Sequence, residues 1–288
     1  MIPIGAMSGS AKHILGVDGG GSGCRAALAD GAGTVLATGE AGPANATSDF
    51  DGAVANIRAA IDAACAGHAV SGLSTHIGLA GILSETDAKR FALALGLPHA
   101  RVTDDRPTTL AGALGGQDGL IAAIGTGSFV GASHSGETRF LGGWGLQLGD
   151  QASGAWLGKT LLQQAMLVHD GLTPPSPLTD AVLTEFNGPN ALVSFARTAT
   201  PTDYAAYAPR VADAAEAGDT VAARAMDVGA GYLSKALKSL GPHPKTPLCL
   251  TGGLGPRYAR WLPPELSARV AAAKGTALDG AVYLATQQ

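Results

Sequence analysis

The sequence predicts an α/β protein of two lobes, in which a unit of three short strands followed by helices occurs twice. Three observations lead to this prediction. The chain has 288 residues, which exceeds the usual size of a single domain. Three short apolar segments separated by turn residues occur near the start of the chain and again after residue 118. Finally, its 42 glycines are about twice the ordinary usage of about 7%, and many cluster at the ends of apolar runs.

The first lobe is expected to span residues 1–117, in the order βββαβα followed by a strand and a further helix. Helical spacing of apolar residues and a polar cap predict helices at 51–66, with Asp49 or Asp51 as cap, at 84–95, with Ser84 as cap, and at 108–114. A closing helix at 277–285, within residues 276–288, could pack back on this lobe. Strands are predicted where apolar residues run between turn residues, at 13–18, 24–30, 33–40, 75–80 and 101–104.

The second lobe is expected to span residues 118–275 and to carry helical insertions. The segment 170–202 is rich in Pro, Thr and Asn and is predicted to be an excursion made mostly of loops. Strands are predicted at 120–124, 128–133, 138–141 and 248–251, and helices at 150–169, 180–186, 203–217 and 219–240.

Composition excludes several classes of function. The net charge is −4 and no cluster of Lys or Arg occurs, which argues against nucleic acid as a partner. The cysteines Cys24, Cys65 and Cys249 are scattered, which argues against a zinc or iron–sulfur site and fits a reducing compartment. No apolar run approaches the roughly 18–20 residues of a membrane helix, so we expect no membrane association and a cytoplasmic protein.

The first glycine cluster follows a predicted strand and precedes another. The stretch Gly21–Ala26 matches the dinucleotide pattern G-x-G-x-x-A, but that fingerprint requires a helix, and the next turn follows too soon for one. A plain tight turn remains open. Asp18, directly before the cluster, could hold Mg²⁺ beside a phosphate. We therefore expect a phosphate-binding hairpin made of Gly19, Gly20, Gly21 and Ser22.

A second turn of small residues lies at the equivalent point of the second lobe. It joins the strands predicted at 120–124 and 128–133. One such turn in each lobe is expected to hold a triphosphate from two sides. The residues of this second turn are Gly125, Thr126, Gly127 and Ser128.

Two adjacent carboxylates, Asp104 and Asp105, end the strand predicted at 101–104. Ligands gather at such strand ends in α/β sheets, and a carboxylate there could accept a proton during phosphoryl transfer. Either residue could instead cap the following helix. Since adjacent strand residues point in opposite directions, only one of them is expected to face a ligand.

Two further glycine-rich segments lie in the second lobe. The run 142–154 surrounds Trp144 and leads to Asp150, whose carboxylate could accept hydrogen bonds from sugar hydroxyls. Asp150 could instead cap a helix, and Trp144 could belong to the core. Gly252 and Gly253 follow an apolar strand, and their backbone could lie against a nucleobase and ribose, although a tight turn explains them equally well.

Taken together, these segments resemble the BadF/BadG/BcrA/BcrD ATPase family, and within it the N-acetylglucosamine and glucosamine kinases. The resemblance covers residues 13–286, and its most specific part is the run GGWG-x-x-x-GD at 142–150. It implies an actin-like, ribonuclease H-like ATPase fold that uses ATP and Mg²⁺. It further implies two phosphate loops at 18–22 and 125–128, an adenosine motif at Gly252 and Gly253, a catalytic Asp105, a metal-binding Asp18, and sugar contacts from Asn45, Asp105, Gly143, Trp144 and Asp150.

The function implied by the resemblance is an ATP-dependent kinase of an amino sugar, with N-acetylglucosamine phosphorylated at its 6-hydroxyl. The family commonly has Glu where this chain has Gln151, and Asn or Thr where it has Asp104, which leaves glucosamine open as the substrate. An ATPase activator and a sugar-binding regulator without kinase activity are alternatives of another class. The resemblance also allows a homodimer.

Overall fold

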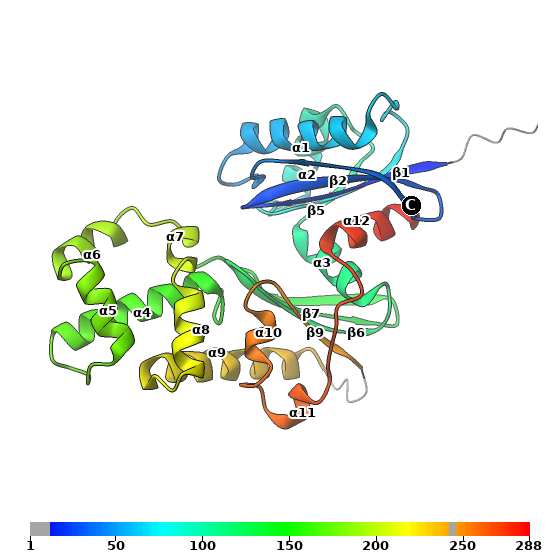
Figure 1. Cartoon of the computed structure of the whole chain (residues 1–288). Coiled ribbons are helices and arrows are strands. Elements are labelled where there is room, and N and C mark those ends of the chain that lie inside the picture. Colours follow the sequence, from blue (N-terminus) through cyan, green and yellow to red (C-terminus); the bar gives the residue numbers. More distant parts are fainter. Residues whose placement is uncertain (1–11, 242–245) are drawn as a thin grey trace, which may run out of the picture. The chain divides into compact units, whose positions relative to one another are not determined.

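The computed structural model describes residues 12–241 and 246–288, so that parts of both predicted lobes, residues 1–11 and 242–245, lie outside it. The chain divides into two compact units (Figure 1). The first extends to Gly116 and also includes Lys274–Gln288, and the second is Gln117–Ala273.

The first unit contains a five-stranded mixed sheet with the order β3-β2-β1-β4-β5. Its first three strands form an antiparallel meander, and β4 and β5 run parallel to β1. The carboxyl ends of β1, β4 and β5 therefore meet at one edge of the sheet. The strands are β1 His13–Gly20, β2 Gly23–Asp30, β3 Val35–Ala41, β4 Ser74–Leu79 and β5 Arg101–Thr103.

Helices cover both faces of this sheet (Figure 1). On one face α1 and α2 pack through Ile57 and Phe91, and on the other α12 packs through Val282, next to α3. Asp49 and Ser84 cap α1 and α2, as predicted. The helix expected at 108–114 begins three residues earlier. The bounds are α1 Phe50–Cys65, α2 Glu85–Leu95, α3 Asp105–Leu114 and α12 Ala277–Thr286.

The second unit repeats the sheet of the first. Its order is β10-β9-β6-β7-β8, with an antiparallel meander of three strands and two strands parallel to the first of them. The predicted α/β class with a duplicated three-strand unit is thus confirmed. The strands are β6 Gly119–Ile124, β7 Ser128–His134, β8 Glu137–Gly142, β9 Leu248–Thr251 and β10 Val270–Ala271.

Two predictions of secondary structure in the second unit were wrong, one of a loop-rich excursion and one of a single helix. The segment 170–202 is mainly helical, and the single helix expected at 203–217 is two helices. Proline accounts for both errors, because it occupies the first turn of α5 to α8, where its missing N–H costs nothing. The helices are α4 Gly154–His169, α5 Pro177–Glu185, α6 Pro189–Ala196, α7 Pro201–Ala205, α8 Ala208–Glu216, α9 Thr220–Ser239, α10 Gly255–Tyr258 and α11 Pro264–Ser267.

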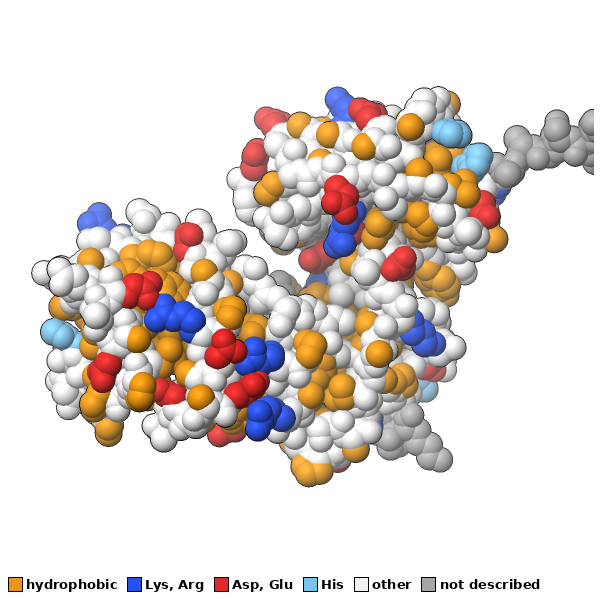
Figure 2. Space-filling view, viewed as in Figure 1, with side chains coloured by type: hydrophobic (Ala, Val, Ile, Leu, Met, Phe, Trp, Pro, Cys, Tyr) orange, Lys and Arg blue, Asp and Glu red, His pale blue; other side chains and the backbone are white. Residues whose placement is uncertain are grey.

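The surface mixes charges of both signs. On the face shown in Figure 2, Lys and Arg side chains are scattered, and several lie beside Asp or Glu. Arg257, for example, pairs with Asp213 and Glu216. Among residues 12–241 and 246–288, no helix has the length and apolar character needed to span a bilayer.

Candidate active site

The first glycine turn joins β1 to β2. The strands pair as far as Gly20 and Gly23, so that Gly21 and Ser22 form the turn. Both turn residues are exposed, and their backbone N–H groups have no hydrogen-bond partner within the described ranges. Free amides of this kind can bind an anion. A strand follows the turn instead of a helix, which excludes the dinucleotide fingerprint.

Gly19 has a packing role in the same hairpin. A Cβ atom at Gly19 would lie 2.6 Å from Cδ1 of Leu79 and 3.0 Å from Cδ1 of Ile57. The missing side chain therefore lets β1 lie close to α1 and β4. Only the tip of this glycine cluster is open to a ligand.

Asp18 lies on β1 opposite Arg25 on β2, and Nη2 of Arg25 is 3.3 Å from Oδ2 of Asp18. Burial raises the pKa of Asp18, and Arg25 opposes this shift. No group of three or more His, Cys, Asp or Glu side chains in the described ranges is arranged to hold a metal. A Mg²⁺ ion at Asp18 would thus take most of its ligands from phosphate and water, as is usual for Mg²⁺ beside nucleotides.

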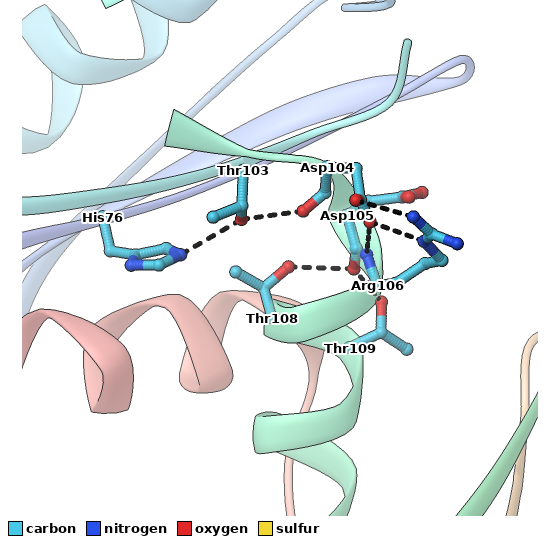
Figure 3. A network of polar contacts seen from close by, with 7 residues as sticks. All are labelled: His76, Thr103, Asp104, Asp105, Arg106, Thr108 and Thr109. Atoms are coloured by element: carbon cyan, nitrogen blue, oxygen red, sulfur yellow. Dashed lines mark hydrogen bonds and ion pairs between the residues drawn. The ribbon is translucent and has the colours of Figure 1, made fainter. Parts of the chain in front are cut away.

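The two adjacent carboxylates have different surroundings (Figure 3). Asp104 is the N-cap of α3, and its oxygens accept hydrogen bonds from Nε and Nη2 of Arg106 at 2.8 and 3.0 Å and from the Arg106 backbone N–H at 2.9 Å. Asp105 is the first residue of α3, and its carboxylate accepts no hydrogen bond from another residue in the part of the chain described. Asp105 is therefore the carboxylate available to a ligand.

The Asp105 carboxyl holds its proton more tightly than an ordinary aspartate. Its pKa is raised to about 6, mainly by burial and also by the negative charges of Asp104 and Asp18, against a smaller opposing effect of Arg106. Both neighbouring carboxylates act on Asp105 because the ends of β1 and β5 meet at one edge of the sheet. A carboxylate with this pKa is largely ionised near neutral pH and is a stronger base than usual, as general-base catalysis requires.

Asn45 is held at the same edge by a loop that runs along the ends of β1 and β4. The Ala44 N–H donates to the Gly20 carbonyl at 2.8 Å, and the Ala46 N–H donates to the Ala80 carbonyl at 2.9 Å. Oδ1 of Asn45 accepts from the backbone N–H groups of the two residues that follow Ala46, at 3.0 and 3.1 Å. Its Nδ2 group is the part that remains for a ligand.

The second glycine turn joins β6 to β7 and is docked on α4. Its own bond runs from the Gly125 N–H to the Gly127 carbonyl at 3.0 Å. The first residues of α4, Gly154 and Ala155, donate their N–H groups to the carbonyls of Gly125 and Thr126 at 2.8 and 3.1 Å. The N–H groups of Thr126 and Gly127 have no partner among the described residues, as at the first turn. This turn can also bind an anion.

Gly252 lies directly against the second turn. Its φ is +78°, and a Cβ atom there would collide with the Ile124 carbonyl and lie 3.0 Å from the Gly125 nitrogen. Gly253, the next residue, has open space around its Cα. Gly252 is thus required by the backbone, and Gly253 is the one that leaves room for a ligand.

Asp150 does not begin a helix as expected. The helix begins at Gly154 with Ser153 as its cap, and Asp150 has a φ of +57° and is only 7% exposed. Its carboxylate accepts the Gly145 N–H at 3.2 Å and the Ser128 N–H. Burial raises its pKa, and these two bonds oppose the shift. Asp150 therefore links the second turn to the glycine-rich loop.

Trp144 is on the surface of that loop and is not a core residue. It is 70% exposed, whereas Gly143 beside it donates its N–H to the Ser128 carbonyl at 2.9 Å. An exposed indole on a loop anchored to the second turn offers an apolar face with a polar N–H, which suits stacking on a sugar ring.

Within each unit, the predicted site residues lie together. In the first unit, Asp18, the turn 19–22, Asn45 and Asp105 share one sheet edge. In the second unit, hydrogen bonds and close contacts join the turn 125–128 to Gly143, Asp150 and Gly252, which Trp144 and Gly253 adjoin in sequence. The sequence analysis missed four further polar residues of these sites. They are Arg25, Arg106, His76 and Thr103.

Known proteins similar to this chain include amino-sugar kinases. The glucosamine kinase GspK of Vibrio cholerae is 30% identical over 284 residues, which cover 95% of this chain and 96% of that protein. The crystal structure of a candidate N-acetylglucosamine kinase from Chromobacterium violaceum is 34% identical, with a TM-score of 0.87 over 96% of this chain and 99% of the other.

More distant structures share the fold. A glucokinase of the ROK family from Streptomyces griseus, solved with glucose and AMPPNP, has a TM-score of 0.57 at 22% identity and covers 96% of this chain and 100% of its own. Residues 15–271 match the sequence model of one protein family, the BadF/BadG/BcrA/BcrD ATPases. On this match, the chain belongs to the BadF/BadG/BcrA/BcrD ATPase family.

Proposed function

We propose that this chain is a kinase that transfers the γ-phosphoryl group of ATP to the 6-hydroxyl of an amino sugar, with N-acetylglucosamine as substrate. The observation that supports it most strongly is the Asp105 carboxyl. It lies at the same sheet edge as Asp18 and the turn with free amides, accepts no bond from another residue in the described ranges, and has its pKa raised to about 6. Membership of an ATPase family and likeness to amino-sugar kinases supply the class of reaction.

In the proposed reaction Asp105 accepts the proton of the sugar hydroxyl as its oxygen attacks the γ-phosphorus. A bond forms between that oxygen and phosphorus, the bond from phosphorus to the bridging oxygen breaks, and ADP leaves. The amides of the turns 19–22 and 125–128 bind phosphate oxygens, and Gly253 lies against the adenosine. Asn45 and Trp144 orient the sugar through Nδ2 and the indole face.

Mg²⁺ fits this site through Asp18, whose carboxylate adjoins the first turn. When bound, the ion would neutralise charge on the phosphate oxygens. The raised pKa of Asp18 reflects burial with a single half-exposed cation, Arg25, as its partner. A divalent cation would satisfy that buried charge better than Arg25 does.

The choice of the acetylated sugar rests on Gln151. Its backbone carbonyl accepts the Ser128 hydroxyl at 2.7 Å, which fixes it beside the second turn and next to Asp150 in sequence. The family commonly has a carboxylate at this position. Since a neutral amide cannot pair with an ammonium group, the substitution favours a neutral acetamido sugar over glucosamine.

The test is ADP formation measured with glucosamine, N-acetylglucosamine, glucose and N-acetylmuramic acid. We expect the highest kcat/KM for N-acetylglucosamine and little ADP without a sugar. Glucosamine as the best substrate would overturn the choice of sugar and match the Vibrio cholerae relative. ADP formation that no sugar stimulates would indicate an ATPase activator, and the absence of turnover would indicate a regulator.

Replacing Gln151 by Glu tests the role of this position. The ratio of kcat/KM for glucosamine to that for N-acetylglucosamine should rise about tenfold, as expected for one added charge-assisted hydrogen bond. Gln163 on the exterior of α4 offers a matched control, since Gln163→Glu adds the same charge to an exposed position more than two helical turns from the second glycine turn. Equal ratios in the two variants would contradict the assignment.

A further inference from the structure

A chain of hydrogen bonds leads to the backbone next to Asp105, the candidate base, on the α3 and α12 side of the first sheet (Figure 3). Nε2 of His76 is 3.2 Å from the hydroxyl of Thr103, and that hydroxyl donates to the Asp104 carbonyl at 2.8 Å. On its other side, Nδ1 of His76 is 3.3 Å from Nε2 of Gln288. The chain ends on the peptide group that joins Asp104 to Asp105.

The direction of each bond follows from the groups involved. A carbonyl only accepts, so the single hydroxyl proton of Thr103 is used on Asp104. His76 must then donate from Nε2, and its Nδ1 lone pair accepts from the amide of Gln288. Burial, with a contribution from the Arg101 charge, lowers the pKa of His76 to about 4, so the ring stays in this neutral form at working pH.

The strand register explains why these residues meet. His76 and Gly78 lie on one face of β4, and Thr103 on β5 is the partner of Gly78. A side chain at Gly78 would collide with Thr108 of α3, so this position of β4 has to be glycine for α3 to pack there. His76 is 2% exposed and therefore packs as a fixed part of the sheet.

The next peptide, which joins Asp105 to Arg106, is held from the α3 side. The hydroxyls of Thr108 and Thr109 donate to the Asp105 carbonyl at 3.0 and 2.7 Å. The backbone of Asp105 is thus bound on both sides, while its carboxylate accepts nothing from another residue in the described ranges. Rigid backbone with a free carboxylate is the arrangement that a proton acceptor requires.

We propose that His76, acting through Thr103, is a positioning group that fixes the Asp104–Asp105 peptide and thereby aims the Asp105 carboxylate at the acceptor hydroxyl. His76 touches no reacting atom in this role. The inference rests on the proposed function of Asp105, and it adds residues that belong to none of the glycine motifs.

The first test removes the hydroxyl from Thr103. Thr103→Val should lower kcat about tenfold and leave KM for the sugar and for ATP within about twofold, because small displacements of a catalytic group mainly affect the chemical step. Thr103→Ser retains the hydroxyl and should restore most of the turnover. Thr75→Val is the matched control, since Thr75 on β4 is also buried and its hydroxyl donates to the Leu73 carbonyl, away from the Thr103 chain of hydrogen bonds.

The second test changes His76 itself. His76→Gln places an N–H near the position of Nε2 and should retain much of kcat, whereas His76→Leu should lose as much as Thr103→Val. The double variant with Thr103→Val should be no worse than either single one, because both break the same chain. Purely additive losses would overturn the proposal.

The dependence of kcat/KM on pH distinguishes a positioning role from a general loss of stability, which would leave the profile in place. A looser peptide lets water reach Asp105, so its pKa should fall and the acid limb of kcat/KM should move to lower pH in Thr103→Val. The charges facing Asp105 are those of Asp104, Asp18 and Arg106, all unchanged in this variant.

Asp105→Asn, measured alongside, separates the two ideas. If it retains turnover, the proposed base is wrong. If it loses turnover while Thr103→Val and His76→Leu match the control in kcat and in pH profile, the base stands and the positioning role is refuted.

Discussion

The rate of phosphoryl transfer should decrease as the pH is lowered, because a single group, the Asp105 carboxyl, becomes protonated. Its pKa is raised from 3.8 to about 6. At about pH 8 nearly all of it is ionised, and at about pH 5 only about one tenth is. kcat/KM should therefore fall about tenfold between these two values. A carboxyl with the ordinary value would still be more than about nine tenths ionised at pH 5 and would produce almost no fall.

The assay is ADP formation in quenched samples, so that coupling enzymes do not impose their own pH dependence. Intact folding at each pH is checked by circular dichroism. The assignment of the limb to Asp105 is tested with Asp104→Asn, which removes the adjacent negative charge and should move the limb to lower pH. A profile that is flat down to about pH 5, or a limb that Asp104→Asn leaves in place, would refute the reasoning.

Two further predictions concern stability. Asp105→Asn should lose about 10²–10⁴-fold in turnover, yet raise the free energy of unfolding at pH 8 by at most about 3 kcal/mol. Because the pKa is raised on folding, the ionised carboxylate destabilises the folded state above about pH 6, and this cost vanishes below pH 3.8. Urea denaturation should therefore show that Asp105→Asn is more stable than the parent at pH 8 and equally stable at low pH. A variant less stable than the parent at pH 8 would contradict this. Gly252→Ala should cost about 1–3 kcal/mol and raise KM for ATP, because φ is +78° and the new Cβ meets the Ile124 carbonyl. Gly253→Ala, which meets nothing within 4 Å, is the control for stability in thermal unfolding, and an equal loss in both would argue against the steric cause.

The sequence predicted the strands of the described residues except β10, because most of them are apolar runs ended by glycine or a polar turn. β10 has only two residues, and both are exposed. The sequence also predicted the caps of α1 and α2, where Asp49 and Ser84 precede periodic helices. It placed the start of α4 four residues too early because Asp150 looked like a cap. The chain instead passes through left-handed conformations at Asp150 and Ala152 before the helix begins. Such conformations are rare for these residue types and carry no local signal.

The candidate site was predictable where glycine motifs occur, where carboxylates end a strand, and where the family resemblance supplied a residue. The residues alone could not choose between Asp104 and Asp105, and the choice of Asp105 came from the resemblance. The structural reason for it is that Arg106 engages Asp104. His76 had no signal at all. Its partners lie 27 and 212 residues away along the chain, and only the register of β4 and β5 brings the first of them into reach.

The abundance of glycine has a second cause besides ligand contact. A methyl group at Gly112 of α3 would overlap the carbonyl of Thr276, and one at Gly280 of α12 would overlap that of Thr108. The backbones of the two helices are thus in direct contact, with no side chain between them at these positions. Even alanine at either position would push α3 away from α12 and carry the first residue of α3, Asp105, with it. Protein engineers who aim to raise helix propensity should therefore leave these two positions unchanged, although they are distant in sequence from the glycine turns.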